Sequence, residues 1–144
     1  MPKGKENLIY LAGLFDGEGF IVIVRSERYD ARHLYKNPNY HLDIGIEMSK
    51  AEFLKDFAKE FGGTFRYIKK REERYKQQMG WRLSGNLASE FLQSILPFLK
   101  VKQEEAKIAI NFQDKIVPEN TKELTLKQLK ERERAFQKIR LVRK

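Results

Sequence analysis

The segment of residues 11–19, LAGLFDGEG, constrains the fold of this chain more than any other part of its sequence. Apolar residues at positions 8, 11, 12 and 15 follow the helical spacing i, i+3, i+4, i+7. They predict a helix that Asn7 caps and Gly19 ends, with the stripe from Leu8 to Phe15 facing the core. The apolar residues 20–24 follow at once and predict a strand. The segment therefore joins a core helix directly to a core strand.

The same segment breaks rules of helix design. Gly13 and Gly17 each cost about 1 kcal/mol relative to alanine inside a helix. Asp16 and Glu18 stand at its C-terminal end, where the helix dipole already presents negative charge. Ile9, Gly13 and Gly17 form a second face that the core stripe leaves unburied. A helix ending on a glycine with two solvated acids is the plain structural alternative. The nine residues together favour a function instead, because such glycines let helices approach closely and carboxylates bind hard cations.

The rest of the chain predicts alternating strands and helices. Residues 41–48 alternate between apolar and polar side chains, as a half-buried strand does. Ser49 with Glu52, and Thr125 with Gln128, form capping boxes that open two further helices. The other expected elements are strands at 65–70 and 81–83, and helices ending at Gly62 or Gly63, at 87–96 and at about 100–116.

These elements predict an α+β domain with the order αββαββα. Two αββ units in series place four antiparallel strands in one sheet with helices on one face. The 144 residues suffice for a single domain, and no linker divides them. We expect a core at about 7–116 and a C-terminal helical extension at 117–144.

The charge of the chain favours a polyanionic partner. Lys and Arg outnumber Asp and Glu by 29 to 20, which gives a formal net charge of +9. Because neutralised phosphates release counterions, nucleic acid is expected before a membrane. With no cysteine and two histidines, disulfides, thiolate zinc sites and a three-histidine metal centre are excluded. No apolar run approaches a membrane span and the start lacks a secretory core, so we expect a soluble, intracellular protein that is not secreted.

LAGLFDGEG resembles the signature of the LAGLIDADG homing endonucleases, from which it differs by Phe for Ile, Gly for Ala and Glu for Asp. The predicted element order is also similar, so the resemblance covers about residues 7–116. It implies a saddle-shaped sheet and hydrolysis of both strands of a long, roughly palindromic DNA site. It further implies that the last acidic position, Glu18, binds the catalytic metal, with the carbonyl of Gly17 as a second ligand. The implied cofactor is Mg²⁺, and Mn²⁺ or Ca²⁺ are able to occupy the site.

The same resemblance implies further site residues. PFLKVKQ, residues 97–103, is similar to the family segment that places a lysine in the active-site pocket, which is Lys102 here. Lys50 stands where relatives carry a polar residue that orients water. A single signature gives one Glu18 per chain, so cutting two strands requires a homodimer with the signature helices at its twofold interface. Besides bonding backbone near the helix ends, Asp16 is counted in that interface, whose expected members are Ile9, Ala12, Gly13, Asp16 and Gly17.

The polar face of the sheet is the expected DNA-reading surface. Strands of about 8–10 residues span about 8–10 base pairs in a major groove. Carboxylates there accept from cytosine, and arginine favours guanine. A solvated sheet face would show the same alternation, and the parity of the third strand is ambiguous. The expected contacts are His41, Asp43, Glu47, Arg66, Lys70, Arg71, Arg74, Lys76, Gln77, Gln78 and Arg82.

Three other functions stay open. An intron RNA maturase is one, because the family includes such members and a basic surface fits RNA as well as DNA. A metal-free DNA-binding regulator on the same scaffold is another, against which the intact Glu18 argues. A basic ribosome-associated protein is a third, and it leaves Gly13, Gly17 and Glu18 together unexplained.

Overall fold

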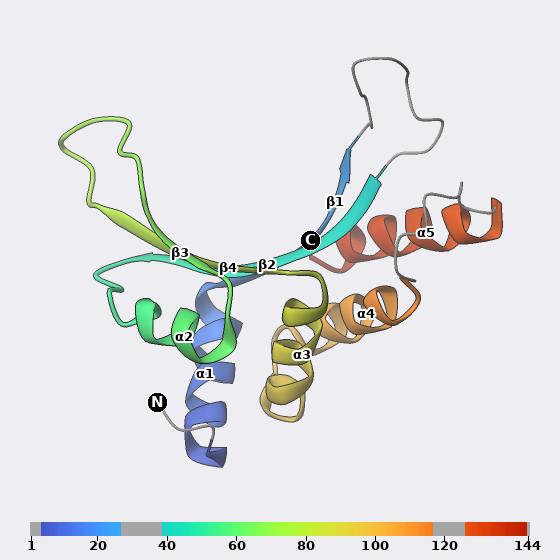
Figure 1. Cartoon of the computed structure of the whole chain (residues 1–144), viewed down its shortest axis with the longest axis horizontal. Helices are drawn as coiled ribbons and strands as arrows, with labels where there is room; N and C mark the ends of the chain where they lie inside the picture. Colours follow the sequence, from blue (N-terminus) through green and yellow to red (C-terminus); the bar gives the residue numbers. More distant parts are fainter. Residues whose placement is uncertain (1–3, 27–38, 117–125, 144) are drawn as a thin grey trace.

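The computed structural model describes residues 4–26, 39–116 and 126–143. Over these residues a helix is followed by two strands, twice, and then by further helices (Figure 1). In chain order the elements are α1 (Lys5–Glu18), β1 (Gly19–Ser26), β2 (Asn39–Ser49), α2 (Leu54–Phe61), β3 (Thr64–Ile68), β4 (Gln78–Ser84), α3 (Gly85–Ile95), the 3₁₀ helix η1 (Leu96–Phe98), α4 (Gln103–Asp114) and α5 (Leu126–Val142).

The strands form one antiparallel sheet in the order β1-β2-β4-β3. Helices α1 to α4 lie on one side of it, and the sheet curves so that its ends bend away from them (Figure 1). The opposite face is therefore concave and carries no helix in this view. The predicted α+β class and the αββαββα order are confirmed.

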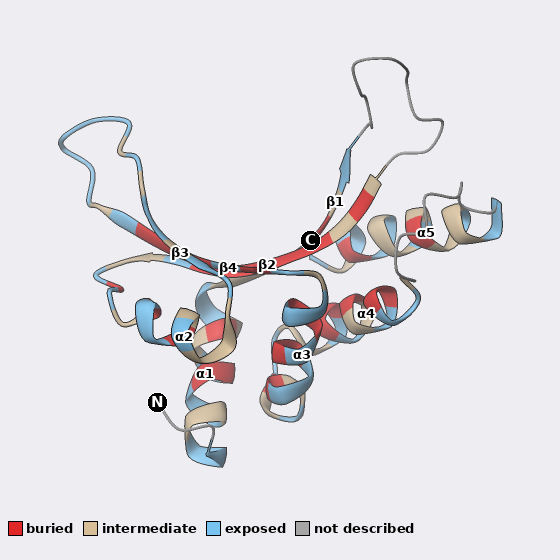
Figure 2. Cartoon of the chain, viewed as in Figure 1, coloured by how far each residue is buried: buried red, intermediate tan, exposed pale blue. Residues whose placement is uncertain are grey.

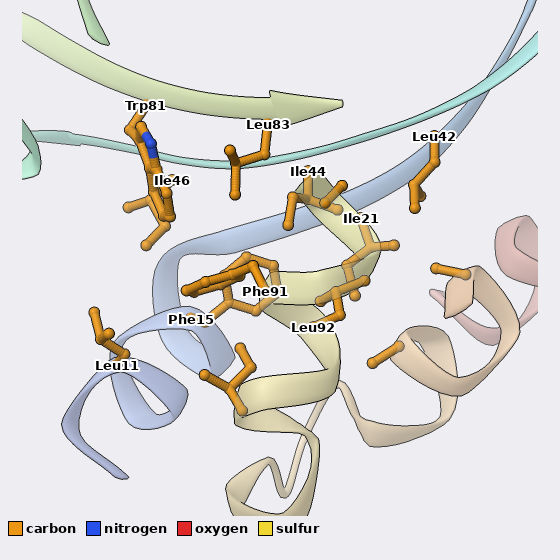
Figure 3. Packing of buried hydrophobic residues seen from close by; sticks show 14 of the residues in the cluster. Leu11, Phe15, Ile21, Leu42, Ile44, Ile46, Trp81, Leu83, Phe91 and Leu92 are labelled. Atoms are coloured by element: carbon orange, nitrogen blue, oxygen red, sulfur yellow. The ribbon is translucent and has the colours of Figure 1, made fainter. Parts of the chain in front are cut away.

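The core fills the space between the sheet and the helices (Figure 3). From α1 it receives Leu11, Ala12 and Phe15, all fully buried, as the helical spacing predicts. The Phe15 ring meets the Phe91 ring edge to face at 5.9 Å between centroids. The indole nitrogen of Trp81, at the centre of the sheet, donates a hydrogen bond to the Gly62 carbonyl at 2.9 Å. These contacts join α1 to α3 and the end of α2 to the sheet.

Two predicted helix caps are wrong. α1 begins at Lys5 after an N-cap at Gly4, one turn before the expected cap at Asn7. Ser49 does not open α2, because it pairs with Gln78 in the β2–β4 ladder and so belongs to the strand. Its predicted partner Glu52 instead accepts a hydrogen bond from the Tyr67 hydroxyl. Thr125 of the second predicted box lies outside the described residues.

The strands also differ in length from the prediction. β4 has 7 residues rather than three, because it lies between β2 and β3 and hydrogen-bonds to both. β3 ends at Ile68, so Lys70 belongs to the connection that follows. Only β1, with 8 residues, has the expected length of 8–10; β2 has 11 and β3 has 5.

Two apolar residues near the starts of the last two helices are exposed. Val101 precedes α4 and Leu126 begins α5, and about 70% of each remains accessible. Val101 lies before α4, which begins at Gln103, and Leu126 is the first residue of α5, so neither is held against the core by a preceding turn of helix. None of the described helices is both long enough and apolar enough to cross a membrane.

Candidate active site

α1 passes into the sheet without a connecting loop. Its last residue is Glu18, and β1 starts at Gly19, whose N–H donates to the Phe15 carbonyl. A Cβ at Gly19 would lie 2.5 Å from a Phe15 ring carbon and 2.6 Å from the Phe15 carbonyl oxygen. Only glycine therefore fits this junction, which holds Glu18 where the helix meets the sheet.

The carboxylate of Asp16 is fully engaged within the chain. It accepts hydrogen bonds from three successive backbone N–H groups, those of Lys100 at 2.8 Å, Val101 at 3.1 Å and Lys102 at 2.9 Å. In return the Lys102 ammonium donates to the Asp16 carbonyl at 2.7 Å. These bonds confirm that Asp16 bonds backbone near helix ends, and they bring Lys102 to the end of α1. The expected contact of Asp16 across the dimer interface stays a prediction.

Glu18 contrasts with Asp16 although only two residues separate them. Its side chain is exposed, and no hydrogen bond or ion pair joins it to the part of the chain that the structure describes. Gly17 is exposed beside it, and its carbonyl is among the last of α1, which have no partner inside the helix. A free carboxylate and a terminal carbonyl fit a hard cation such as Mg²⁺, which takes one or two protein carboxylates and keeps waters and phosphates. Across the described ranges, no three His, Asp or Glu side chains gather into a metal-binding group.

The two candidate lysines lie in different surroundings. Lys102 is the N-cap residue of α4 and is partly buried, and its ammonium is fixed on Asp16. Lys50 follows β2 in a left-handed backbone conformation, φ 52°, and is exposed. It lies four residues beyond Ile46, the partner of Gly19, which is roughly 13 Å along the strand. The structure brings Lys102, but not Lys50, to the end of α1.

The concave face of the sheet carries the strand residues expected to contact DNA. Their neighbours in sequence point into the core, so strand alternation places them on the opposite side. The parity of β3 is now settled, because Phe65 and Tyr67 face α2, where the Lys55 ammonium lies 5.4 and 5.3 Å from their ring centroids. The expected contacts that share the concave face are His41, Asp43 and Glu47 of β2, Arg66 of β3, and Gln78 and Arg82 of β4.

Asp43 must be removed from the expected base contacts. It is 7% exposed, and its two carboxylate oxygens face the Ser84 hydroxyl and the His41 ring nitrogen. Asp43 pairs with Ser84 across the β2–β4 ladder, which explains the hydrogen bond. Glu47 is more open, with its carboxylate 4.0 Å from the Arg66 guanidinium.

The connection between β3 and β4, residues 69–77, extends the concave face with positive charge. It carries five Lys or Arg and two Glu, and most of it is exposed (Figure 2). Arg74 contacts Glu72 and lies over the Tyr75 ring at 5.1 Å. The Gln77 amide donates to the carbonyls of Ile68 and Gln78, so its donors hold the hairpin and are not available to DNA bases. The cations of this hairpin are Lys69, Lys70, Arg71, Arg74 and Lys76.

The bare face of α1 is its outer, exposed side, which carries Ile9, Gly13 and Gly17. A Cβ added at Gly13 or Gly17 would meet no atom within 4 Å, so nothing in the described chain requires glycine there. Ile9 is 47% exposed beside them. Ala12 is fully buried in the core and must be removed from the expected interface. Tyr10, 56% exposed, was missed; its spacing of three residues from Gly13 would have revealed it.

No family model matches this sequence, and no curated protein matches it. Solved structures do match its fold. The homing endonuclease I-CvuI, in complex with the I-CreI target, has a TM-score of 0.75 and 24% identity, over 96% of this chain and 82% of its own. The archaeal intron-encoded homing endonuclease I-Vdi141I, complexed with DNA, has a TM-score of 0.72 and 15% identity, over 95% and 84%. The homing endonuclease I-TnaI has a TM-score of 0.63 and 17% identity, over 94% of both chains.

The fold is therefore that of the LAGLIDADG homing endonucleases, as the resemblance of residues 11–19 implied. The chain is most similar, among the three described, to I-CvuI.

Proposed function

We propose that this chain is a metal-dependent endonuclease that, as a homodimer, hydrolyses both strands of a long, roughly palindromic duplex DNA site. The observation that carries the proposal is Glu18, an exposed carboxylate without a partner among the described residues, at the junction of α1 and the sheet. Homing endonucleases of the same fold, I-CvuI and I-Vdi141I, were solved as DNA complexes.

The bare face of α1 supports the homodimer. Gly13 and Gly17 each cost about 1 kcal/mol against alanine, yet the chain leaves open space at both. A second helix that packs against this face gives the glycines a purpose, because a Cβ would keep two backbones apart. A twofold axis along α1 brings two Glu18 side chains together, one for each DNA strand.

The site residues have separate tasks in the proposed reaction. The Glu18 carboxylate and the Gly17 carbonyl would hold Mg²⁺, which would supply positive charge against the phosphate and lower the pKa of a bound water. Lys102 adds a fixed positive charge near the scissile phosphate. Asp16 is a positioning residue, because its hydrogen bonds to residues 100–102 hold Lys102 in place. Lys50, which the resemblance suggests as a residue that orients water, is left out of the proposed site, because it lies roughly 13 Å along the strand from the partner of Gly19.

The concave face and the cationic hairpin are the proposed DNA surface. Arg66, Arg82 and Gln78 line the sheet, and the five cations of residues 69–77 lie at its edge. Phosphate contacts of this kind release counterions, so affinity for duplex DNA should fall steeply as salt rises.

Cleavage by Glu18→Gln tests the proposal. A duplex site is first selected from a randomised pool by the wild-type chain in Ca²⁺, and is then incubated with enzyme in Mg²⁺. We expect Glu18→Gln to bind the site but to cut it on the order of 100-fold more slowly. The control is Glu90→Gln, which removes an exposed carboxylate from α3 and should cut like the wild type. Cleavage by Glu18→Gln at the control rate would refute the assignment.

A further inference from the structure

Phe20 and Arg82 form a unit on the concave face that the proposed function does not account for. We propose that Phe20 is a positioning residue that holds Arg82 so that Arg82 reads a guanine at an inner base pair of each DNA half-site. The inference rests on the proposed binding of duplex DNA by this face. It adds to the proposed function which base Arg82 contacts and which residue positions Arg82.

The two residues lie in one row across three strands. Phe20 of β1 pairs with Gly45 of β2, and Gly45 pairs in turn with Arg82 of β4. Ile21 and Leu83, the next residues along, are buried in the core, so Phe20 and Arg82 point to the concave side. The glycine between them leaves the row without a central side chain.

Gly45 makes room for the phenyl ring. A Cβ at this position would lie 2.8 and 2.9 Å from two Phe20 ring carbons and 2.5 Å from the Trp81 carbonyl oxygen. The ring therefore lies across the strand, directly over the Gly45 backbone. Any side chain at position 45 would displace it.

Arg82 lies above this ring. Its guanidinium carbon is 5.5 Å from the Phe20 ring centroid, within the range of a cation–π contact. No carboxylate pairs with it in the described part of the chain, whereas Arg66 on the same face lies 4.0 Å from Glu47. The Arg82 side chain is exposed, so its N–H donors are open to a ligand.

An exposed guanidinium that has no carboxylate partner and lies over a ring is well placed to bind guanine. Arginine donates two hydrogen bonds to guanine O6 and N7 in the major groove, the commonest specific contact to a base. A side chain already held over a ring loses less rotamer freedom on binding than a free one. Phe20 follows Glu18 by two residues, at most about 7 Å of chain, and Arg82 lies over the Phe20 ring, so the base pair read lies near the cleaved bonds.

The test compares base preferences of variants of the full chain. Each protein selects from a pool of randomised duplexes in Ca²⁺, and the enrichment of each base is measured at every position. The wild type should enrich guanine at one inner position of each half-site. Arg82→Lys keeps the charge but loses the rigid planar pair of donors that matches both acceptors, and should lose about 10- to 100-fold of that preference.

Phe20→Leu should lose about 2- to 5-fold of the guanine preference at the same position and keep its base preferences elsewhere, because it removes only the cation–π contact. Phe20→Tyr keeps the ring and should restore the preference. Arg140→Lys is the matched control, because Arg140 lies over the Phe136 ring on α5, outside the proposed DNA surface, and it should leave the guanine position unchanged. Thermal unfolding of each variant verifies that it is folded. If Phe20→Leu is not folded, the comparison of Phe20→Tyr with Arg82→Lys is sufficient to test the inference.

The inference is overturned if Phe20→Leu keeps the full guanine preference, or if it weakens all sequences equally. It is also overturned if Arg82→Lys keeps the preference while Phe20→Tyr loses it. These results leave the endonuclease proposal intact, because the wild type still selects a site. A wild type that enriches no sequence would instead refute the proposed function, and the inference with it.

Discussion

The first and the last helix pack on the same sheet by different means. α1 buries a purely apolar stripe, Leu11, Ala12 and Phe15, and turns a bare glycine face outward. α5 packs on β1 and α4 with a mixed surface that buries Ile139 and Arg132. The difference teaches that α1 is a core element with one surface left for a partner, whereas α5 is an added support for the outer sheet.

Polar contacts fasten α5 to the sheet. Glu133 accepts hydrogen bonds from the Tyr40 hydroxyl at 2.6 Å and the Arg25 guanidinium at 3.0 Å. The Phe136 and Tyr40 rings meet edge to face at 6.2 Å. A shallow groove of about 440 Å³ runs beside these residues, which leaves the contact partly open to water.

Core substitutions in the two helices should show the largest effect. Phe15→Ala should lower the free energy of unfolding by about 3–5 kcal/mol, because a fully buried ring leaves a cavity. Ile139→Ala should cost toward the lower end of about 2–5 kcal/mol, because α5 borders water. Urea unfolding of both variants measures this, and an Ile139→Ala cost above that of Phe15→Ala would contradict the comparison.

Substitution on the bare face of α1 should weaken association without destabilising the protomer. Gly13→Leu has open space in the chain and should raise the stability of one protomer by up to about 1 kcal/mol. The same side chain should separate two packed helices, so sedimentation should show at least a tenfold weaker dimer and cleavage should fall with it. Gln137→Leu, an exposed and uncharged position of α5, is the control and should remain dimeric. A stable Gly13→Leu dimer would remove α1 from the interface.

The Glu133 contacts should make the attachment of α5 sensitive to acid. The Tyr40 hydroxyl first, and then Gln137 and Arg25, lower the pKa of Glu133 below its ordinary value. A lowered pKa stabilises the folded chain above the unfolded pKa of about 4.5, and the gain is lost as pH falls through the folded value. Because this group is partly exposed, Glu133→Gln should lower the free energy of unfolding by less than about 1 kcal/mol at pH 7. Well below pH 4 it should not lower it at all. An equal cost at both pH values would count against this account.

The ionisation of Glu105 in α4 should change the stability of the fold in the opposite direction to that of Glu133, and by the smallest amount of all. Burial raises its pKa, against the nearby charges of Lys102 and Arg143, which lower it. Its ionisation therefore opposes folding as pH rises, and the difference between folded and unfolded chains vanishes below the unfolded pKa of about 4.5. Glu105→Gln should raise the melting temperature slightly at pH 7 and leave it unchanged near pH 3. A lower melting temperature at pH 7 would show that the charge is needed for its neighbours.

Much of the fold could be predicted because its signals are local. The stripe of α1, its end at Gly19 and the alternation of β2 each depend on neighbours within a few residues. The caps at Asn7 and Ser49 failed for the converse reason. Whether a residue caps a helix depends on what else bonds to it, and the pairing of Ser49 with Gln78 is invisible in a short window.

The candidate site also has features that the local sequence predicts and others that depend on distant contacts. Glu18 is found from its segment alone, since two carboxylates after a glycine-rich helix are a local anomaly. What distinguishes it from Asp16 is not local, because the N–H groups that occupy Asp16 lie 84 to 86 residues away. The burial of Asp43 and the placing of Phe20 beneath Arg82 also require the register of neighbouring strands.

By itself, the sequence determined the order of the elements, the two stripes of α1 and the position of two acids at its end. Periodicity and glycine placement encode these features within single segments. Only the tertiary structure decided which acid stays free, which lysine lies at the end of α1 and which polar residues of the concave face are already paired. Those outcomes depend on hydrogen bonds and contacts between residues far apart in the chain, and such contacts form only when the sheet and helices come together.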